Sequence, residues 1–556
     1  ASWSLGENSL VNFMIKPSGH AHVSTNLFMY ALVFGCSLLP LAIPIHTSIN
    51  PFDEGIILNN AYRISLGDSP YIDFWTGYMP GQYYAVGLLF KLFGPSVLVE
   101  RWWDIFIRAF FLLALFIFSR DKFKVGYSLI IWLIAVLLLA GSGSYGNPLY
   151  PALFWSLAAI LLIENYFRSS KRIWLFAAGL SIGLVIWFRW DFGVYAGIAN
   201  SLALFFFLKS KSKSQNNARQ IAWKSAAALA AGVMVACLLL VVLILMQGAL
   251  NEFINQVFVF PSTVLQYFRM KPYPSVLLPF QFFVPNGENR VDQLPDLFYW
   301  VLFYYPVLLS FLFAWWMLSG LRKKDSNPQF FSWMAFGVTG LLLIAYSVSR
   351  FDYPHALPVS LFVCPLTILL LSSVKQFQHK PIKTIVFPLT LFLMGVSYLF
   401  FPVIVLTNAL VSFSPFQCFS NFPRAQCIYM DADQLLVLDY IDSVTADSDA
   451  IFVGNTRHDR ILTNDISLYF LAGLRAGTSY YELEPGVATT YAVQEEIIAG
   501  LKLSGVRWIV LVDTPVAEEY NQASVSSQVY LLDNYIAQNY RQEKTFGRFA
   551  VLQAVP

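Results

Sequence analysis

Charged residues are scarce in this chain. Asp, Glu, Lys and Arg make up 12% of its 556 residues, whereas 57% are hydrophobic and 17% are aromatic. With a mean hydropathy of +0.57, the composition lies outside the range of soluble globular proteins and indicates a polytopic membrane protein. The net charge of +3 includes no concentrated basic patch, so nucleic acid is not expected as a partner.

Secretion signals and cysteines are scarce as well. Residues 1–26 lack the basic region and the small-residue cleavage site of a secretory signal, so the first apolar segment is expected to be a retained anchor behind a cytoplasmic segment. Three of the five cysteines fall within apolar segments, where a buried thiol is the ordinary state. Cys418 and Cys427 could pair in an oxidising compartment, but their spacing alone does not decide this.

Long apolar segments dominate what remains. A membrane-spanning helix needs about 20 apolar residues, and eleven segments of 27–406 approach that length. We predict a bundle of about eleven spans at 27–48, 96–118, 125–142, 149–167, 173–188, 192–208, 225–248, 297–319, 329–347, 356–374 and 382–406.

Basic residues collect in alternate connections between these segments. They gather at 120–124, 168–172, 209–219, 322–324 and 375–383, and short basic loops stay on the cytoplasmic side. With an odd number of spans, 407–556 is then predicted to be extracytoplasmic. We expect that side to be the periplasm or an equivalent lumen.

The C-terminal part, 407–556, has the pattern of a small α/β domain. Apolar residues at helical spacing alternate with short apolar strands, an order that builds a layered core. Helices are predicted at 433–444, 491–503 and 529–540, and strands at 450–453, 508–512 and 549–552.

Two long connections are predicted to lie on the same outer side. The loop 50–95 includes a short amphipathic helix at 82–93 that is expected to lie along the membrane. The loop 249–296 is rich in aromatic residues and proline and is too long for a simple connection. We interpret it as a lid or a lipid-contacting flap, with a disordered linker as the alternative.

Charged residues also stand at the outer ends of the spans. The carboxylates Asp53 and Glu54 follow the first span, and a charge at a membrane boundary indicates function. Arg189 with Asp191, and Arg350 with Asp352 and His355, end later spans on the same side. Arginine presents a planar fork to phosphate oxygens, so these residues are candidates for one shared site. Helix capping by the acidic pair and plain ion pairs at span ends are the structural alternatives.

The motifs in these loops resemble a known family. D-E-G at 53–55 is followed by A-Y-R-I-S-L-G-D-S-P-Y-I-D-F, P-G-Q-Y-Y, F-G-P-S and Arg101. This pattern is similar to the GT-C integral membrane glycosyltransferases, in the group of protein O-mannosyltransferases and aminoarabinose transferases. The later segments 188–196, 350–355 and 455–460 look like those of uncharacterised bacterial members of this class, which implies a bacterial inner (plasma) membrane as the location. The oligosaccharyltransferase signature W-W-D-Y-G is missing, which disfavours en bloc glycan transfer.

The resemblance implies a reaction and roles for the residues. A sugar would move from a polyprenyl-phosphate-linked donor to an acceptor hydroxyl on a lipid, glycan or protein, at the extracytoplasmic face. Asp53 matches the acidic residue that opens the family's loop and is therefore the candidate base. Glu54 would orient the acceptor or tune Asp53, and Asp73 and Arg101 are further substrate-binding candidates. Arg101 could instead snorkel from its span.

The sequence does not decide whether a metal is bound, and two other functions are alternatives to the transferase. Asp53, Glu54, Asp73 and His355 could hold a divalent metal, but no ligand spacing is diagnostic, so no cofactor is assigned. A transporter or flippase of a lipid-linked sugar is the competing class, although transporters usually carry internal repeats and none is evident here. A non-catalytic scaffold of the same fold is the third alternative.

Overall fold

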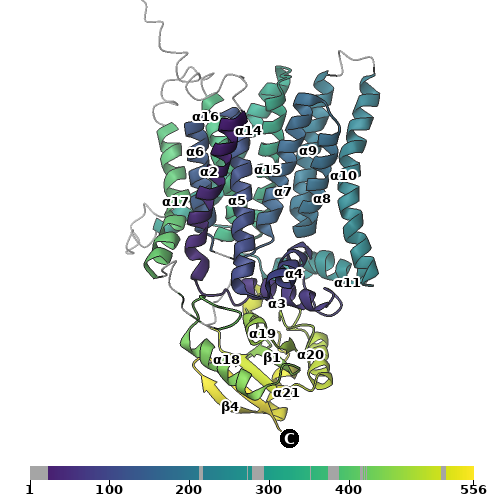
Figure 1. Ribbon diagram of the computed structural model, residues 1–556, viewed down its shortest axis with the longest axis vertical. Coiled ribbons are helices and arrows are strands. Elements are labelled where there is room, and N and C mark those ends of the chain that lie inside the picture. Colours follow the sequence, from purple (N-terminus) through teal and green to yellow (C-terminus); the bar gives the residue numbers. More distant parts are fainter. Residues whose placement is uncertain are drawn as a thin grey trace, which may run out of the picture.

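The computed structural model describes residues 23–555, apart from 144, 212–216, 272, 278–293, 351, 374–386, 413–417, 419, 421, 462 and 515–520. A bundle of long helices forms one part, and a small mixed α/β part is attached to one end of it (Figure 1). The predicted cytoplasmic segment 1–26 lies almost wholly outside the described residues, as does much of the second half of the 249–296 loop.

Each of the eleven predicted apolar segments falls on a helix of the bundle. These helices are α2 (Val23–Ala42), α5 (Val97–Lys122), α6 (Val125–Ala140), α7 (Leu149–Ser169), α8 (Ile173–Phe188), α9 (Trp190–Lys211), α10 (Ala218–Met246), α14 (Leu294–Arg322), α15 (Pro328–Ser349), α16 (Tyr353–Ser373) and α17 (Phe387–Ser412). Within the described residues, eight helices are long and apolar enough to cross a membrane, and α6 and α8 are apolar but shorter. The protein is therefore an integral membrane protein.

Small residues let neighbouring helices approach closely within this bundle. A side chain added at Gly179 of α8 would collide with the main chain of Leu229 in α10, and one added at Gly232 of α10 would collide with Phe176 of α8. Van der Waals contact of this kind is what joins helices in lipid, where apolar side chains gain nothing by leaving the solvent. The glycines thus determine how close α8 and α10 lie.

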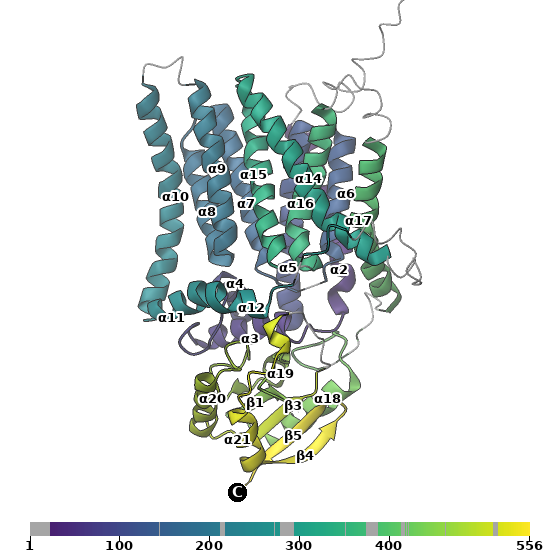
Figure 2. The ribbon, with the colours of Figure 1, turned by 180° about the vertical axis from the view of Figure 1, so that it is seen from behind.

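Short helices lie between the bundle and the C-terminal part. They are α3 (Asp53–Leu66), α4 (Gly81–Phe93), α11 (Leu250–Ile254), the π-helical η3 (Asn255–Val259) and η4 (Pro261–Leu265), and α12 (Gln266–Phe268). Figure 2 shows the last four crossing the end of the bundle above the C-terminal part. The helix predicted at 82–93 is confirmed as α4. The first half of the predicted 249–296 loop is helical, which its aromatic and proline content did not reveal.

The C-terminal part is built on a mixed five-stranded sheet with the order β2-β1-β3-β5-β4. β1 pairs in parallel with β2 and β3, while β5 pairs antiparallel with β3 and β4. Its elements are α18 (Ala432–Val444), β1 (Ala450–Asn455), α19 (Ser467–Ala472), β2 (Arg475–Ala476), α20 (Tyr491–Leu503), β3 (Trp508–Val512), η7 (Gln522–Ser524), α21 (Leu531–Asn539), β4 (Tyr540–Phe546) and β5 (Phe549–Ala554). All six predicted elements are confirmed, whereas α19, β2 and β4 were not predicted. The mainly α fold with a small C-terminal α/β part is thereby confirmed.

The C-terminal part is joined to α3 by direct main-chain contacts. The amides of Ile466 and Ser467 donate to the carbonyl of Pro51 at 2.9 and 3.2 Å. A side chain at Gly55 would lie 2.7 Å from the amide nitrogen of Ser467, so only glycine permits this approach. Deeper in the same interface, the Asn60 amide donates to the buried Glu482 carboxyl at 3.0 Å.

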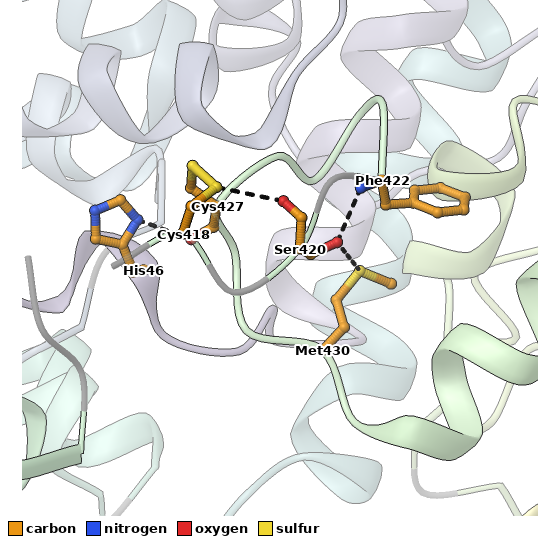
Figure 3. Close-up of a disulfide and its surroundings, with 6 residues drawn as sticks. All are labelled: His46, Cys418, Ser420, Phe422, Cys427 and Met430. Carbon is orange, nitrogen blue, oxygen red and sulfur yellow. Dashed lines mark hydrogen bonds between the residues drawn. A yellow bond between two sulfur atoms is a disulfide. The ribbon is translucent and has the colours of Figure 1, made fainter. Parts of the chain in front are cut away.

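A disulfide joins Cys418 and Cys427, which confirms that these two cysteines pair (Figure 3). The carbonyl of Cys427 lies 2.8 Å from His46 Nδ1, at the end of the short helix η1 (Ile43–His46) that follows α2. The amide of Tyr429 also donates to the carbonyl of His46 at 2.9 Å. The bridged segment therefore attaches the start of the C-terminal part to the end of the first span.

Candidate active site

Asn50 caps the first turn of α3. Its side-chain oxygen accepts from the amides of Phe52 and Asp53 at 3.1 and 2.9 Å. The main-chain amide of Asn50 donates to Glu54 Oε2 at 2.9 Å, whereas the Asp53 carboxylate accepts only a long hydrogen bond of 3.5 Å from the Asn50 side-chain amide. Helix capping therefore does not account for the Asp53 carboxylate.

Glu54 points the opposite way from its neighbour, into a buried ion pair. Arg101 of α5 donates to both of its carboxylate oxygens at 2.7 and 3.0 Å, and both side chains are 1% exposed. The same guanidinium donates to the carbonyls of Ile45, Thr47 and Ser48 at 2.6, 2.8 and 3.2 Å. This geometry favours a structural role for Glu54 and Arg101, which connect α3, α5 and the end of the first span, and leaves Arg101 no snorkelling position.

Asp53 is accessible to solvent, but the surrounding protein still affects its ionisation. Desolvation raises the pKa of its carboxyl above the ordinary value, while Arg269 and Arg350 act in the opposite direction and Glu484 and Asp352 add to the rise. These four groups come from three different parts of the chain. Asp53 is thus brought into the same electrostatic neighbourhood as Arg350, as the candidate site requires.

Arg269 follows α12 and connects the helical segment of the 249–296 loop to the C-terminal part. Its guanidinium donates to both oxygens of Glu484 at 2.8 and 3.0 Å. Burial lowers its pKa, but the ion pair with Glu484 more than compensates, and the net pKa is raised. Its carbonyl accepts a hydrogen bond of 2.7 Å from Arg350 Nη1. The Arg350 guanidinium therefore lies against the main chain of Arg269, and both arginines interact electrostatically with Asp53.

Asp352 contacts both Arg350 and His355 just after the end of α15. It accepts from Arg350 Nε at 2.7 Å and lies 2.6 Å from His355 Nδ1. Burial alone would raise the pKa of Asp352, but His355 and Arg350 hold it below the ordinary value. The three residues form one compact group with a fixed arrangement.

The aromatic ring of Tyr346 connects this group to Arg189 and Asp191, the other charged pair predicted at the end of a span. The imidazole of His355 stacks on Tyr346 at 4.7 Å between ring centroids, and the Arg189 guanidinium lies 4.8 Å from the centroid of the same Tyr346 ring. Arg189 in turn donates to both oxygens of Asp191 at 2.9 and 2.6 Å. Burial lowers the pKa of Arg189, yet Asp191 and Tyr346 keep it raised overall. Arg189, Asp191, Arg350, Asp352 and His355 are thus brought together.

Tyr78 interacts electrostatically both with these groups and with Asp53. Burial raises the pKa of its phenol, with further contributions from Glu484 and Asp53, and the same phenol interacts electrostatically with Arg189. Nearby, burial raises the pKa of the Glu482 carboxyl to about 8. The phenol and the acid are therefore both neutral near pH 7.

Asp73 lies in a separate turn of the outer loop. Its carboxylate accepts from the amide of Ser69 at 2.6 Å, and its carbonyl accepts from Arg63 at 3.0 Å. Neither contact leads toward Asp53. Within the described part of the chain, no three His, Cys, Asp or Glu side chains come close enough to hold a metal ion.

The sequence reasoning missed Arg269, Glu484 and Tyr78. Arg269 is a charged residue within an otherwise aromatic stretch, a signal that could have singled it out. Glu484 lies 215 residues further along the chain, and no local pattern links the two.

The architecture has counterparts among solved structures. No protein-family model matches the chain, and no curated protein sequence matches it. The crystal structure of the aminoarabinose transferase ArnT from Cupriavidus metallidurans, bound to undecaprenyl phosphate, is 13% identical, with a TM-score of 0.51 over 96% of this chain and 99% of that one. This chain has the GT-C fold.

Two larger structures match this chain with TM-scores below 0.5. The arabinofuranosyltransferase AftD from Mycobacteria is 12% identical, with a TM-score of 0.49 over 98% of this chain and 40% of that one. The arabinosyltransferase EmbB from Mycobacterium smegmatis is 14% identical, with a TM-score of 0.44 over 73% of this chain and 43% of that one. The GT-C fold therefore rests on the ArnT structure, and at 13% identity that comparison establishes the fold alone.

Proposed function

We propose that this protein is a membrane glycosyltransferase that moves a sugar from a polyprenyl-phosphate-linked donor to an acceptor hydroxyl at the extracytoplasmic face. The observation that carries the proposal is the position of Asp53, an accessible carboxylate of raised pKa beside Arg269 and Arg350. The GT-C fold shared with ArnT, whose structure holds undecaprenyl phosphate, supports the choice of donor.

Asp53 acts as the general base in this proposal. The acceptor oxygen attacks the sugar C1 and forms the new glycosidic bond, while its proton passes to Asp53. A positioned base of this kind contributes about 10²- to 10⁴-fold in rate. Because a raised pKa brings a carboxylate closer to the operating pH, the environment of Asp53 suits the role. Activity should fall as the pH drops through that pKa and the carboxylate is protonated.

The cations hold the leaving group. As the bond between C1 and the phosphate oxygen breaks, its electron pair stays on the polyprenyl phosphate, which needs positive charge more than a proton. Arg350 and Arg269 supply it, and Arg189 and His355 extend the basic surface through Tyr346. Glu484 and Asp352 hold the guanidinium groups in place before the donor arrives.

The test uses Asp53→Asn in the full-length protein. Purified enzyme is incubated with a panel of undecaprenyl-phosphate-linked monosaccharides and a membrane extract from the source cells, and released undecaprenyl phosphate is measured. We expect release by the wild-type protein and a loss of at least about 10²-fold in the variant. Movement of the lipid-linked sugar between leaflets without release of undecaprenyl phosphate would instead indicate a transporter.

A further inference from the structure

The first turn of α3 holds the ring of Phe52 in a fixed place. Phe52 directly precedes Asp53. Its amide donates to Asn50 Oδ1 at 3.1 Å, and its carbonyl accepts from the amide of Ile56 at 2.8 Å. Phe52 is 7% exposed, whereas Asp53 is accessible to solvent. Two consecutive residues of one helix turn therefore face different surroundings.

The buried Phe52 ring lies against Arg269. The central guanidinium carbon of Arg269, Cζ, is 5.0 Å from the centroid of the ring, a distance at which an aromatic ring attracts a cation. Glu484 accepts from Nε and Nη2 of the same guanidinium at 2.8 and 3.0 Å. Because a carboxylate fork acts in the guanidinium plane and the ring is a separate restraint, Arg269 is held by two distant segments of the chain.

The main chain around Arg269 is anchored as well. Its amide donates to the carbonyl of Leu265 at 2.9 Å, and its carbonyl accepts from Arg350 Nη1 at 2.7 Å. The carbonyl of Met270 accepts from Asn521 Nδ2 at 3.1 Å. A long side chain loses rotamer freedom when it binds a ligand, so a guanidinium that is already held in place binds a phosphate at a smaller entropic cost.

We propose that Phe52 is a positioning residue whose ring holds the Arg269 guanidinium where it binds the donor phosphate. This inference rests on the proposed function, because it deepens the role of Arg269 in holding the leaving group. The turn of α3 that carries the base then also fixes a cation for the phosphate. The spacing between base and cation is thereby set by two adjacent residues, Phe52 and Asp53.

A purely structural role is the alternative, because Phe52 also belongs to an apolar cluster that joins α3 to the C-terminal part. A structural role predicts a loss of stability, with donor dependence unchanged for the protein that remains folded. A positioning role predicts weaker donor binding by the folded protein. Phe52→Leu separates the two, because leucine keeps the site apolar but presents no ring to the guanidinium.

The first experiment compares Phe52→Leu with the wild-type protein in the undecaprenyl phosphate release assay, with rates normalised to the folded fraction. The donor concentration for half-maximal rate should rise at least about 5-fold, as expected for a largely desolvated cation–π contact. The requirement for membrane extract should not change. Phe52→Tyr retains the ring and should behave as the wild-type protein. An unchanged donor requirement in Phe52→Leu, or an equal rise in Phe52→Tyr, would overturn the inference.

Phe549→Leu is the matched control for the loss of a buried ring beside an arginine. The Phe549 ring is buried and lies 4.9 Å from the guanidinium carbon of Arg548, which pairs with Asp431 in the C-terminal part. The variant should lose stability and keep the donor requirement of the wild-type protein. An equal rise in the control would show that loss of stability alone weakens donor binding, which would overturn the role of Phe52.

A second experiment asks whether Phe52 acts through Arg269. Arg269→Gln removes the guanidinium and should itself raise the donor requirement. Adding Phe52→Leu to Arg269→Gln should then cause little further loss, because the ring no longer has a cation to hold. Full additivity of the two changes would mean that the ring does not act through Arg269.

A third measurement does not depend on glycosyl transfer. Undecaprenyl phosphate that binds the folded protein raises the midpoint of thermal unfolding, and undecaprenol, which lacks the phosphate, shows how much of the rise comes from the lipid chain. Phe52→Leu should need at least about 5-fold more undecaprenyl phosphate than the wild-type protein for the same rise, with an unchanged response to undecaprenol.

This binding measurement also separates the inference from the proposed function. If the wild-type protein bound undecaprenyl phosphate but released none from any donor, the proposed function would fail, and the comparison would still decide the role of Phe52. An equal requirement for undecaprenyl phosphate in the two proteins, or no binding by the wild-type protein, would refute that role.

Discussion

Asp53 and Glu54 are adjacent in the chain, and we expect their conservative replacements to have opposite consequences. Glu54→Gln removes one charge from a pair whose two side chains are each 1% exposed. The Arg101 charge then stays buried without its counterion, although its bonds to three carbonyls remain. Breaking a buried pair from one side costs about 3 to 5 kcal/mol, and the remaining contacts favour the lower end, about 3 kcal/mol.

Asp53→Asn is the matched change on the exposed side of the same helix turn. Asn50 caps this turn through the Asp53 amide, which the substitution leaves in place, so the free energy of unfolding should change by no more than about 0.5 kcal/mol. The carboxylate that would accept the proton is lost, however, and turnover should fall by at least about 10²-fold.

The assay measures both quantities on the same detergent-solubilised samples. Unfolding is followed by tryptophan fluorescence, which the 15 tryptophans of the chain make strong, and single-turnover release of undecaprenyl phosphate is normalised to the folded fraction. We expect Glu54→Gln to lose stability and retain its rate, and Asp53→Asn to show the reverse. A stable but inactive Glu54→Gln protein would refute the structural role of Glu54, and an active Asp53→Asn protein would refute Asp53 as the base.

Three further predictions follow from the geometry. Arg350→Ala should raise the donor KM at least about 10-fold, because a charge-assisted hydrogen bond contributes about 1.5 to 3 kcal/mol. The acceptor concentration for half-maximal rate should change little, and equal effects on donor and acceptor would contradict a role of Arg350 in binding the donor phosphate. The Glu482 carboxyl has a pKa of about 8 when folded and an ordinary value of 4.5, so the folded state binds the extra proton and stability should fall by up to about 1.4 kcal/mol per pH unit between these values. Glu482→Gln should flatten that dependence in a series of unfolding curves. Replacing Cys418 and Cys427 together with Ser should lower the free energy of unfolding by roughly 2 to 3 kcal/mol, and an unchanged value in oxidising buffer would contradict a stabilising bridge.

Hydropathy and charge placement predicted the bundle and much of the candidate site. The ends of α8 and α15 were recognisable because Arg189 and Arg350 interrupt long apolar runs, and a charge at that depth needs a partner or a function. Since both helices end on the side of the bundle that carries α3, their charged residues were expected near Asp53. The electrostatic interaction of Asp53 with Arg350 agrees with that expectation.

Other aspects of the site lie beyond what local pattern can reveal. Consecutive helical residues point about 100° apart, so Asp53 and Glu54 were expected to face different surroundings, but no local pattern indicated which of the two faces inward. Arg269 and Glu484 meet only because the loop helices and the C-terminal part fold over the same end of the bundle. Contacts of such separation depend on the whole topology, which explains why they were not predicted.

The close approach of Gly55 to Ser467 has a consequence for building chimeras of this architecture. The C-terminal part rests on α3 without intervening side chains at that point, so its surface there is shaped for one particular helix. If the C-terminal part alone were exchanged for that of another protein, the new part would have to pack on an α3 for which its surface is not shaped. The alignment that brings Glu484 to Arg269 would then be lost. The smallest transplantable unit therefore combines two stretches from opposite ends of the polypeptide.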